Sequence, residues 1–404
     1  MNNYSFIRLN FKYLFFGFIL TFCSSFGQTF FIGIFNPFFR EEINLTNTEF
    51  GTLYSSATLL SSLILIWVGK LIDETSLRKF TLFVGLSLAS TCLFIGILNS
   101  IIMLFIGLFF LRLFGQGLMC HISSTSMAKY FNLNRGKALG FSWLGLSLGE
   151  GILPGFMIFL LSAFYWKNIW IGISIFLFII VIPLLLFLIK KERVSDTIFQ
   201  EKQVQQIKNW KRGDVIRDIK FYFLLPAILA PPFLITGIFL NQSFIFESKD
   251  WDMFYLARGF VFYAIFSVIS LGISGILIDK FSARKILPFY LIPMILSFLI
   301  VINSNLIFSP ILFMIMLSIT NGASNVLITS TWSEIYGTKY LGSIRALTVS
   351  LMVFSTALAP IIFGYLIDIG MSVNSIFKLM LVYLISSIVL LLIKFKSYKP
   401  TLIT

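Results

Sequence analysis

Charge is scarce in this 404-residue sequence, and histidine and cysteine are scarcer still. Only 12% of the residues are charged, against 58% that are hydrophobic, and the chain holds one histidine and three cysteines. A composition this apolar excludes an ordinary soluble domain. Because Cys23, Cys92 and Cys120 lie inside apolar runs without the spacing of metal ligands, we expect neither a disulfide framework nor a metal site.

The same scarcity limits the chemistry that the chain can perform. A catalytic centre inside a membrane needs several histidine, acidic or cysteine side chains at one depth, so a single histidine with sparse acids argues against an enzyme and against catalytic residues. No nucleotide-binding P-loop motif occurs, which argues against a pump driven by nucleotide hydrolysis. We therefore expect no cofactor.

Long apolar runs, by contrast, repeat along the whole chain. A helix needs about 20 consecutive apolar residues to cross a bilayer, whereas barrel strands alternate in polarity over about ten residues. The sequence therefore predicts an all-α integral membrane protein with twelve transmembrane helices. The predicted spans are 13–36, 48–69, 80–98, 101–127, 138–163, 166–189, 221–246, 254–278, 284–303, 306–332, 342–368 and 374–394. The apolar stretch of the first is too long for a signal peptide, so we expect an uncleaved anchor.

Basic residues are unevenly distributed between the predicted loops. With the N-terminus in the cytoplasm, most of the 31 lysines and arginines fall on the inner side, and Arg112 falls in mid-membrane. The exceptions near the outer side are Arg40, Lys167, Lys249, Arg258 and Lys378. This bias predicts a plasma (inner) membrane protein with both termini in the cytoplasm. It also accounts for the net charge of +14 without nucleic acid as a partner.

The chain contains two related halves. Residues 190–220 form the longest inner segment and are predicted to link an N-terminal six-helix bundle, 1–189, to a C-terminal one, 221–404. GKLIDETSLRK at 69–79 and GILIDKFSARK at 275–285 agree at seven of eleven positions when they are aligned at an offset of 206 residues. This duplication predicts two pseudo-symmetric bundles, a known design of secondary transporters.

The charged turns and the twelve spans resemble the major facilitator superfamily. GKLIDETSLRK is similar to the loop between the second and third helices of that family, and LRLFGQG at 111–117 resembles its fourth-helix pattern. SEIYGTKYLGSIRAL and the Arg112 motif look most like bacterial carriers of the monocarboxylate and oxalate type. The resemblance implies transport by alternating access, in which two bundles rock about a central site.

Under the family arrangement the duplicated turns act as a conformational latch between the halves. Glycine permits close approach of two helices, and a carboxylate is favoured at the positive N-terminus of a neighbouring helix. Whether the arginines pair with these carboxylates or only set the topology stays open. The latch candidates are Gly69, Asp73, Arg78, Gly275, Asp279 and Arg284.

Two ionisable residues are predicted near the bilayer midplane, where such groups are costly and usually face a cavity or a partner. Arg112 and Glu150 belong to consecutive spans, so a pair between them is geometrically reasonable. Glu150 is a candidate proton carrier, because burial favours its neutral form and a guanidinium favours its carboxylate. The alternatives are a fixed salt bridge and direct binding of a substrate carboxylate by Arg112.

Other polar residues within the spans extend the list of substrate contacts. Their competing explanation is hydrogen bonding between helices, which any membrane bundle uses. The candidates are Gln28, Gln116, Asn241, Gln242 and Asn325. We expect His121 to be a hydrogen-bonded packing residue because it lies on the opposite helical face from Arg112, and we expect Trp332 and Tyr336 at the inner interface.

These observations leave two functions open, both for a monomer in the lipid bilayer. The first is a secondary active transporter of a small organic solute, such as a carboxylate held by Arg112, with H⁺ as the coupling ion. The alternative is a proton-coupled exporter of cationic or neutral amphiphiles bound near Glu150, since GLSLGEGILPG at 145–155 resembles the fifth-helix motif of drug antiporters. A non-transporting membrane receptor is a third, more distant interpretation.

Overall fold

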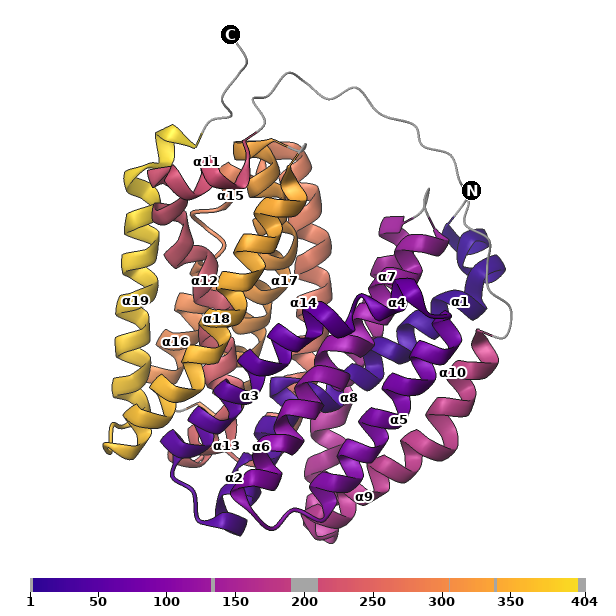
Figure 1. The fold of residues 1–404 in the computed structure, drawn as a ribbon. Helices are drawn as coiled ribbons and strands as arrows, with labels where there is room; N and C mark the ends of the chain where they lie inside the picture. Colours follow the sequence, from indigo (N-terminus) through magenta and orange to yellow (C-terminus); the bar gives the residue numbers. More distant parts are fainter. Residues whose placement is uncertain (1–2, 132–134, 190–209, 305, 338–339, 399–404) are drawn as a thin grey trace. The chain divides into compact units, whose positions relative to one another are not determined.

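The computed structural model describes residues 3–131, 135–189, 210–304, 306–337 and 340–398, and within these ranges it excludes the side chains of residues 3–5, 73, 129, 135, 325, 342 and 346 (Figure 1). Contacts between Cα atoms divide the chain into two compact units that meet at residue 200. Unit 1 is the part before this boundary, and unit 2 is the part after it. Each consists of helices packed side by side.

Unit 1 contains six membrane-crossing segments, as the sequence predicts. Several are composite helices, in which short 3-10 or π-helical pieces (η) join α-helical ones. The elements are α1 (Asn3–Ser24), η1 (Ser25–Gly27), α2 (Thr29–Ile43), α3 (Asn47–Val68), α4 (Leu71–Glu74), α5 (Leu77–Gly96), α6 (Ile101–Phe110), η2 (Leu111–Met119), α7 (Cys120–Tyr130), α8 (Arg135–Ala163), α9 (Trp166–Phe176), η3 (Leu177–Val181) and α10 (Ile182–Leu188).

Local sequence signals explain where these helices begin. The amide of Glu49 donates to the Thr46 hydroxyl (3.1 Å), and the amide of Thr46 donates to the Glu49 carboxylate (2.9 Å), which is a capping box at the start of α3. Ser76 and Ser100 cap α5 and α6 through their side chains. These caps satisfy amide groups that have no partner inside their own helix.

The described part of unit 2 contains five long helices and several shorter ones. Its elements are α11 (Arg212–Arg217), α12 (Ile219–Leu240), α13 (Gln242–Ser248), α14 (Met253–Phe281), α15 (Ala283–Ile286), α16 (Ile292–Asn303), α17 (Ser309–Tyr336), α18 (Leu341–Asp368), α19 (Val373–Ile393) and η4 (Phe395–Ser397). Within the described residues of both units, eleven helices are long and apolar enough to cross a membrane. The chain is thus an all-helical, multi-pass membrane protein.

The ninth predicted span, 284–303, is the one that differs most from its prediction. Its helix, α16, has only 12 residues and a length of about 18 Å, against a hydrocarbon core of about 30 Å. Pro288 precedes the helix, and Pro293 lies in its first turn. Because proline has no amide hydrogen and restricts the residue before it, the helix cannot extend back through these positions.

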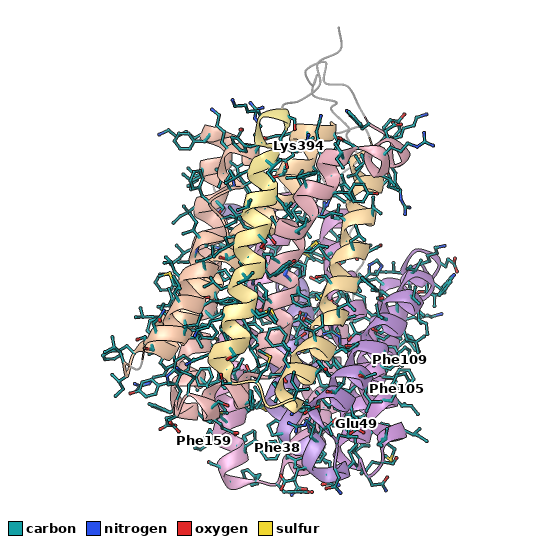
Figure 2. All side chains as sticks on the ribbon, turned by 90° about the vertical axis from the view of Figure 1, so that its left-hand side faces the viewer. Phe38, Glu49, Phe105, Phe109, Phe159 and Lys394 are labelled. Atoms are coloured by element: carbon teal, nitrogen blue, oxygen red, sulfur yellow. The ribbon has the colours of Figure 1, made fainter. Side chains whose placement is uncertain are left out.

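Apolar side chains cover the outside of the helices, as expected where the surroundings are lipid. Phe159, labelled in Figure 2, is 67% exposed, and Ile276 is 70% exposed. Trp332 and Tyr336, predicted at the inner interface, are both fully buried within unit 2, and their rings stack with centroids 5.8 Å apart. The Tyr336 hydroxyl donates to the Asp218 carboxylate (3.2 Å), and the Tyr336 carbonyl accepts from the Trp210 amide (3.0 Å). These bonds attach the segment before α12 to the end of α17.

Candidate functional site

The first membrane-crossing segment of unit 1 is broken in the middle. Between α1 and α2 the chain forms the 3-10 turn Ser25–Gly27, and Gln28 then adopts an extended conformation (φ −83°, ψ 153°). The Phe31 amide donates to the Gln28 carbonyl (3.2 Å), so the carbonyl of Gly27 lies outside the helical ladder of α2. Such irregular backbone at membrane depth requires other partners within the protein.

Two glycines bring this break against the π-helix η2. A Cβ on Gly27 would collide with the Leu111 carbonyl and lie 2.6 Å from the amide nitrogen of Gln116. A Cβ on Gly115 would lie 2.8 Å from the Cα of Gly27. Since all of these neighbours are backbone atoms, only glycine at both positions permits the contact.

Arg112, on η2, points its guanidinium at the break. Its Nη1 donates to the Gly27 carbonyl (3.1 Å) and to the Thr29 hydroxyl (3.4 Å). The guanidinium carbon lies 5.2 Å from the centre of the Tyr54 ring on α3, a cation–π distance. The Tyr54 and Thr29 hydroxyls are themselves hydrogen-bonded at 2.8 Å. Arg112, Gly27, Thr29 and Tyr54 thus form one cluster, which we call the arginine site.

The arginine site holds a positive charge without a carboxylate partner. Arg112 is 4% exposed, and within the described part of the chain no acidic side chain forms an ion pair with it. Its Nε is buried and donates to no described group. Burying a charge is costly unless hydrogen bonds or an opposite charge compensate it. A guanidinium carries donors in a fork geometry that suits a carboxylate, and the Nε donor of Arg112 has no described partner.

Glu150 lies on α8, which packs closely on the first segment. A Cβ on Gly149 would collide with the Ser25 hydroxyl, and one on Gly145 would collide with the Phe18 carbonyl. The Thr21 hydroxyl also donates to the Ser142 carbonyl across this interface. The glycines before Glu150 therefore serve close packing. Gly149, the residue directly before Glu150, packs against Ser25 of the break. Glu150 itself is partly exposed and makes no ion pair with Arg112 in the described structure.

Gln28 and Gln116 lie beside the arginine site. Gln28 is the residue before α2, and Gln116 is the η2 residue whose amide faces Gly27; both are half-buried. Substrate contact by Gln28 and Gln116 stays a prediction. The sequence prediction did not include Thr29 and Tyr54, whose only sequence signal is a polar group within a predicted span.

Two of the three unit 2 candidates have side chains within the described part of the structure. Asn241 and Gln242 are buried at the junction of α12 and α13, and the Asn241 side-chain amide donates to the Gly237 carbonyl of its own helix (2.9 Å). Asn325 belongs to α17, and its side chain lies outside the described part of the structure. Substrate contact by these three residues stays a prediction.

The charged turn of unit 1 has an unexpected partner. His121 Nε2 lies 3.0 Å from the Gly69 carbonyl, and a Cβ on Gly69 would lie 3.4 Å from the same nitrogen. His121 is therefore a hydrogen-bonded packing residue that closes the end of α3. Arg78 is exposed, and the side chain of Asp73 lies outside the described residues.

The corresponding turn of unit 2 is built differently. A Cβ on Gly275 would have no other atom within 4 Å, so close packing is not the reason for glycine there, and Asp279 is exposed. The amides of Ala283 and Arg284 donate to the carboxylate of Glu334 on α17 (2.7 and 3.2 Å). Glu334 was not predicted as a functional residue. The latch between the halves stays a prediction.

The fold and the site together define a multi-pass helical membrane protein with a charged group held at a helix break. The family model of the Major Facilitator Superfamily matches residues 17–349. The chain belongs to this superfamily and is a secondary transporter, a class that is typically not enzymatic. A search of curated proteins gave no match.

Solved structures of transporters show the same fold. A bacterial homologue of the human lysosomal transporter Spinster, in an inward-facing and unoccupied conformation, aligns with a TM-score of 0.63 and 13% identity over 96% of this chain and 95% of the other. The nucleoside transporter NupG aligns with a TM-score of 0.67 and 14% identity over 96% of this chain and 99% of the other. At such low identity the likeness concerns the fold alone.

Proposed function

We propose that this transporter carries a small organic anion whose carboxylate binds Arg112. The observation that supports this substrate class is the buried guanidinium of the arginine site, whose Nε donates to no described group and which forms no ion pair with an acidic side chain among the described residues. Gly27 and Thr29 fix one nitrogen of the fork, so the remaining donors have a defined direction. Bidentate pairing with a carboxylate gives both affinity and orientation.

Glu150 is the proposed carrier of the coupling proton. It is a single acidic residue in the middle of a membrane-crossing helix, partly exposed and unpaired with Arg112. A carboxyl group in such a position takes up and releases protons as its surroundings change between apolar and wet. We infer that protonation of Glu150 and occupation of the arginine site alternate or coincide during the transport cycle.

The proposed topology follows from the distribution of basic residues. We propose that both termini lie in the cytoplasm, that the protein is in the plasma (inner) membrane and that residues 190–220 link the halves there. Under this arrangement the residues of the two charged turns lie on the inner side, where the latch operates. We propose that the transporter works as a monomer.

A thermal-shift screen of the purified protein in detergent tests the substrate class. The panel contains organic acids, amino acids, sugars and cationic amphiphiles, and a ligand at 100 times its dissociation constant stabilises the protein by about 2.7 kcal/mol. We expect carboxylates to raise the melting temperature of the wild type but not of Arg112→Lys, since lysine lacks the planar fork. Arg258→Lys, at an exposed arginine outside the arginine site and the charged turns, is the matched control.

The screen also separates the two substrate classes left open by the sequence. A shift with cationic amphiphiles alone, removed by Glu150→Gln and retained in Arg112→Lys, would identify an exporter of such compounds and overturn the anion proposal. For the coupling ion, uptake into proteoliposomes should respond to an imposed pH gradient in the wild type and lose this response in Glu150→Gln.

A further inference from the structure

Unit 1 contains a large apolar groove that the arginine site does not use. Its volume is about 640 Å³, within the usual range for ligand-binding cavities. It lies between the first segment, which contributes Phe22 and Phe26, the second half of α8 and most of α9. Asn168 is the single polar residue in its lining.

The lining selects the chemistry of the occupant. A carboxylate or an ammonium group would find no charged partner there, and small-molecule sites use several convergent polar groups to orient a ligand. Ile152 and Phe156 on α8 are 52% and 51% exposed, so the groove is open along a helix face that adjoins lipid chains in a membrane-crossing segment. A saturated or unsaturated hydrocarbon chain satisfies this lining without any polar contact.

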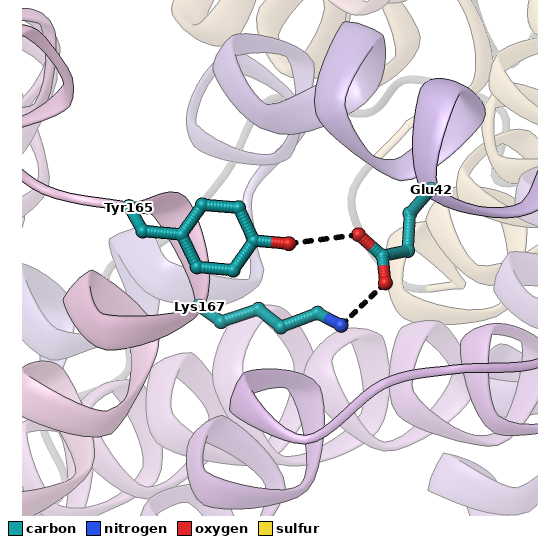
Figure 3. Close-up of polar contacts among 3 residues, drawn as sticks. All are labelled: Glu42, Tyr165 and Lys167. Carbon is teal, nitrogen blue, oxygen red and sulfur yellow. Dashed lines mark hydrogen bonds and ion pairs between the residues drawn. The ribbon is translucent and has the colours of Figure 1, made fainter.

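The length and the polar end of the groove match one leaflet of a bilayer. From Ile152 to its end at Ala163, α8 rises about 17 Å, close to half of a hydrocarbon core of about 30 Å. Beyond this end lies a polar cluster, shown in Figure 3. The Lys167 ammonium contacts the Glu42 carboxylate (2.5 Å), and the Tyr165 hydroxyl donates a hydrogen bond to the same carboxylate (2.9 Å). This hydrogen bond raises the pKa of the Tyr165 phenol. Asn168 follows the cluster directly and is exposed.

We propose that the groove is a binding site for one acyl chain of a membrane phospholipid, with the ester region of that lipid beside Asn168. The acyl chain lies against Phe22 and Phe26. Phe26 belongs to the 3-10 turn in which the Gly27 carbonyl accepts a hydrogen bond from Arg112. A bound lipid therefore fills the space behind the helix break and supports the conformation of the arginine site. The groove is a lipid site, separate from the transported solute.

Gly172 provides a way to close the groove. It lies in the lining on α9, and no heavy atom lies within 4 Å of the position of a Cβ there. The Cβ of a Gly172→Phe side chain therefore meets no neighbour, and we expect its ring to occupy part of the groove. Gly272→Phe on α14 is the matched control, because Gly272 is likewise an exposed glycine of a membrane-crossing helix with open space around it.

Photolabelling of the full-length protein in phosphatidylcholine liposomes tests the proposal. A trace of phosphatidylcholine with a diazirine in its acyl chain is activated by light, and labelled peptides are mapped by mass spectrometry. We expect labelling concentrated in residues 152–176 of the wild type and of Gly272→Phe, and its loss in Gly172→Phe. Even labelling over all exposed helix faces, or full labelling of Gly172→Phe, would overturn the proposal.

A second measurement on the wild type covers the case in which Gly172→Phe does not fold. The photoactive phosphatidylcholine is titrated from a low to a high lipid-to-detergent ratio. A discrete site predicts that labelling of residues 152–176 saturates at a ratio at which labelling of α14 still rises linearly. Parallel, linear rises of both signals would mean that the groove binds no lipid preferentially.

Discussion

The first membrane-crossing segment of unit 1 is broken, whereas that of unit 2 stays helical. This is the opposite of what the positions of their prolines suggest. In unit 1 the segment breaks at Ser25–Gly27, although the break itself contains no proline. In unit 2, α12 stays helical from Ile219 to Leu240 although it contains three prolines, Pro226, Pro231 and Pro232. The partners that receive the freed backbone groups therefore decide whether the helix breaks.

In α12 one such partner is a tyrosine hydroxyl. Pro231 has no amide hydrogen, so it leaves the Ala227 carbonyl without its helical donor. The Tyr290 hydroxyl donates to this carbonyl (2.5 Å). In unit 1 the free Gly27 carbonyl instead receives the Arg112 guanidinium. One arrangement preserves a helix, and the other builds a charged site.

The duplication makes the contrast sharper. At the offset of 206 residues that aligns the charged turns, Phe233 corresponds to Gly27 and Ser318 corresponds to Arg112. Ser318 donates to the Ile315 carbonyl of its own helix (2.7 Å) and reaches no other segment through this bond. Unit 2 thus has neither the glycine contact nor the arginine, and the proposed anion site belongs to unit 1 alone.

The largest effect is expected from Gly27→Ala. The new methyl group meets the backbone of η2, which cannot move aside, so we expect a loss of about 3 kcal/mol or more in stability and loss of transport. In Gly237→Ala of α12 the methyl group meets the ring of Phe363, a side chain that can rotate, and the loss should be smaller. Melting temperatures in detergent rank the two variants. Equal losses would show that the break is not constrained by its neighbours.

Tyr290→Phe tests the partner of the proline-containing helix. Removal of the hydroxyl leaves the buried Ala227 carbonyl without its donor, so we expect about 1–3 kcal/mol lower stability. Pro231→Ala returns an amide hydrogen to this position, and the double variant should therefore lose less than the sum of the single variants. Chemical or thermal unfolding of all four proteins gives the coupling. Strict additivity would contradict the assigned role of Tyr290.

Thr29→Val and Tyr54→Phe each remove one contact of the arginine site, so they test these contacts separately. Thr29→Val removes the hydroxyl that accepts from Arg112, and we expect about 1 kcal/mol weaker carboxylate binding. Tyr54→Phe keeps the ring near the guanidinium and loses only the bond to Thr29, so its effect should be smaller. Titration of a carboxylate ligand by thermal shift measures both. A larger effect of Tyr54→Phe would place the tyrosine hydroxyl, instead of Thr29, in contact with the ligand.

The smallest effect is expected from His121→Gln. Glutamine retains a donor for the Gly69 carbonyl, so stability should change by less than about 1 kcal/mol and the pH profile of transport should stay the same. His121→Leu, which has no donor, should lose stability but keep the same pH profile. Initial rates of uptake between pH 5 and pH 8 provide the comparison. A profile that changes in His121→Gln would identify a proton relay in place of a packing residue.

The sequence predicts the membrane-crossing segments well because apolar length is a local property. Eleven predicted spans coincide with long apolar helices, and the ninth is shortened where Pro288 and Pro293 interrupt it. The depth of Arg112 was likewise predictable from its distance to the ends of its span. Its partners were not, because the break at Gly27 depends on a contact with Gly115 that is remote in the chain.

The duplicated turns show the same limit of prediction from sequence, here for residues that are identical in the two halves. Identical residue types occupy Gly69 and Gly275, yet Gly69 packs near His121 and Gly275 has open space around it. Glu334, which holds the amides of the second turn, has Ala128 as its counterpart at the same offset. Sequence identity within a repeat therefore does not fix the local contacts, because these depend on residues outside the repeated motif.

Uptake of labelled lactate and oxalate into proteoliposomes under an inward proton gradient tests the central claim most directly. The wild type and Arg258→Lys should accumulate at least one of these carboxylates, and Arg112→Lys should lose this uptake while it keeps its melting temperature within a few degrees. Undiminished uptake of the carboxylate by a folded Arg112→Lys protein would contradict the assignment of the arginine site as the place where the substrate anion binds.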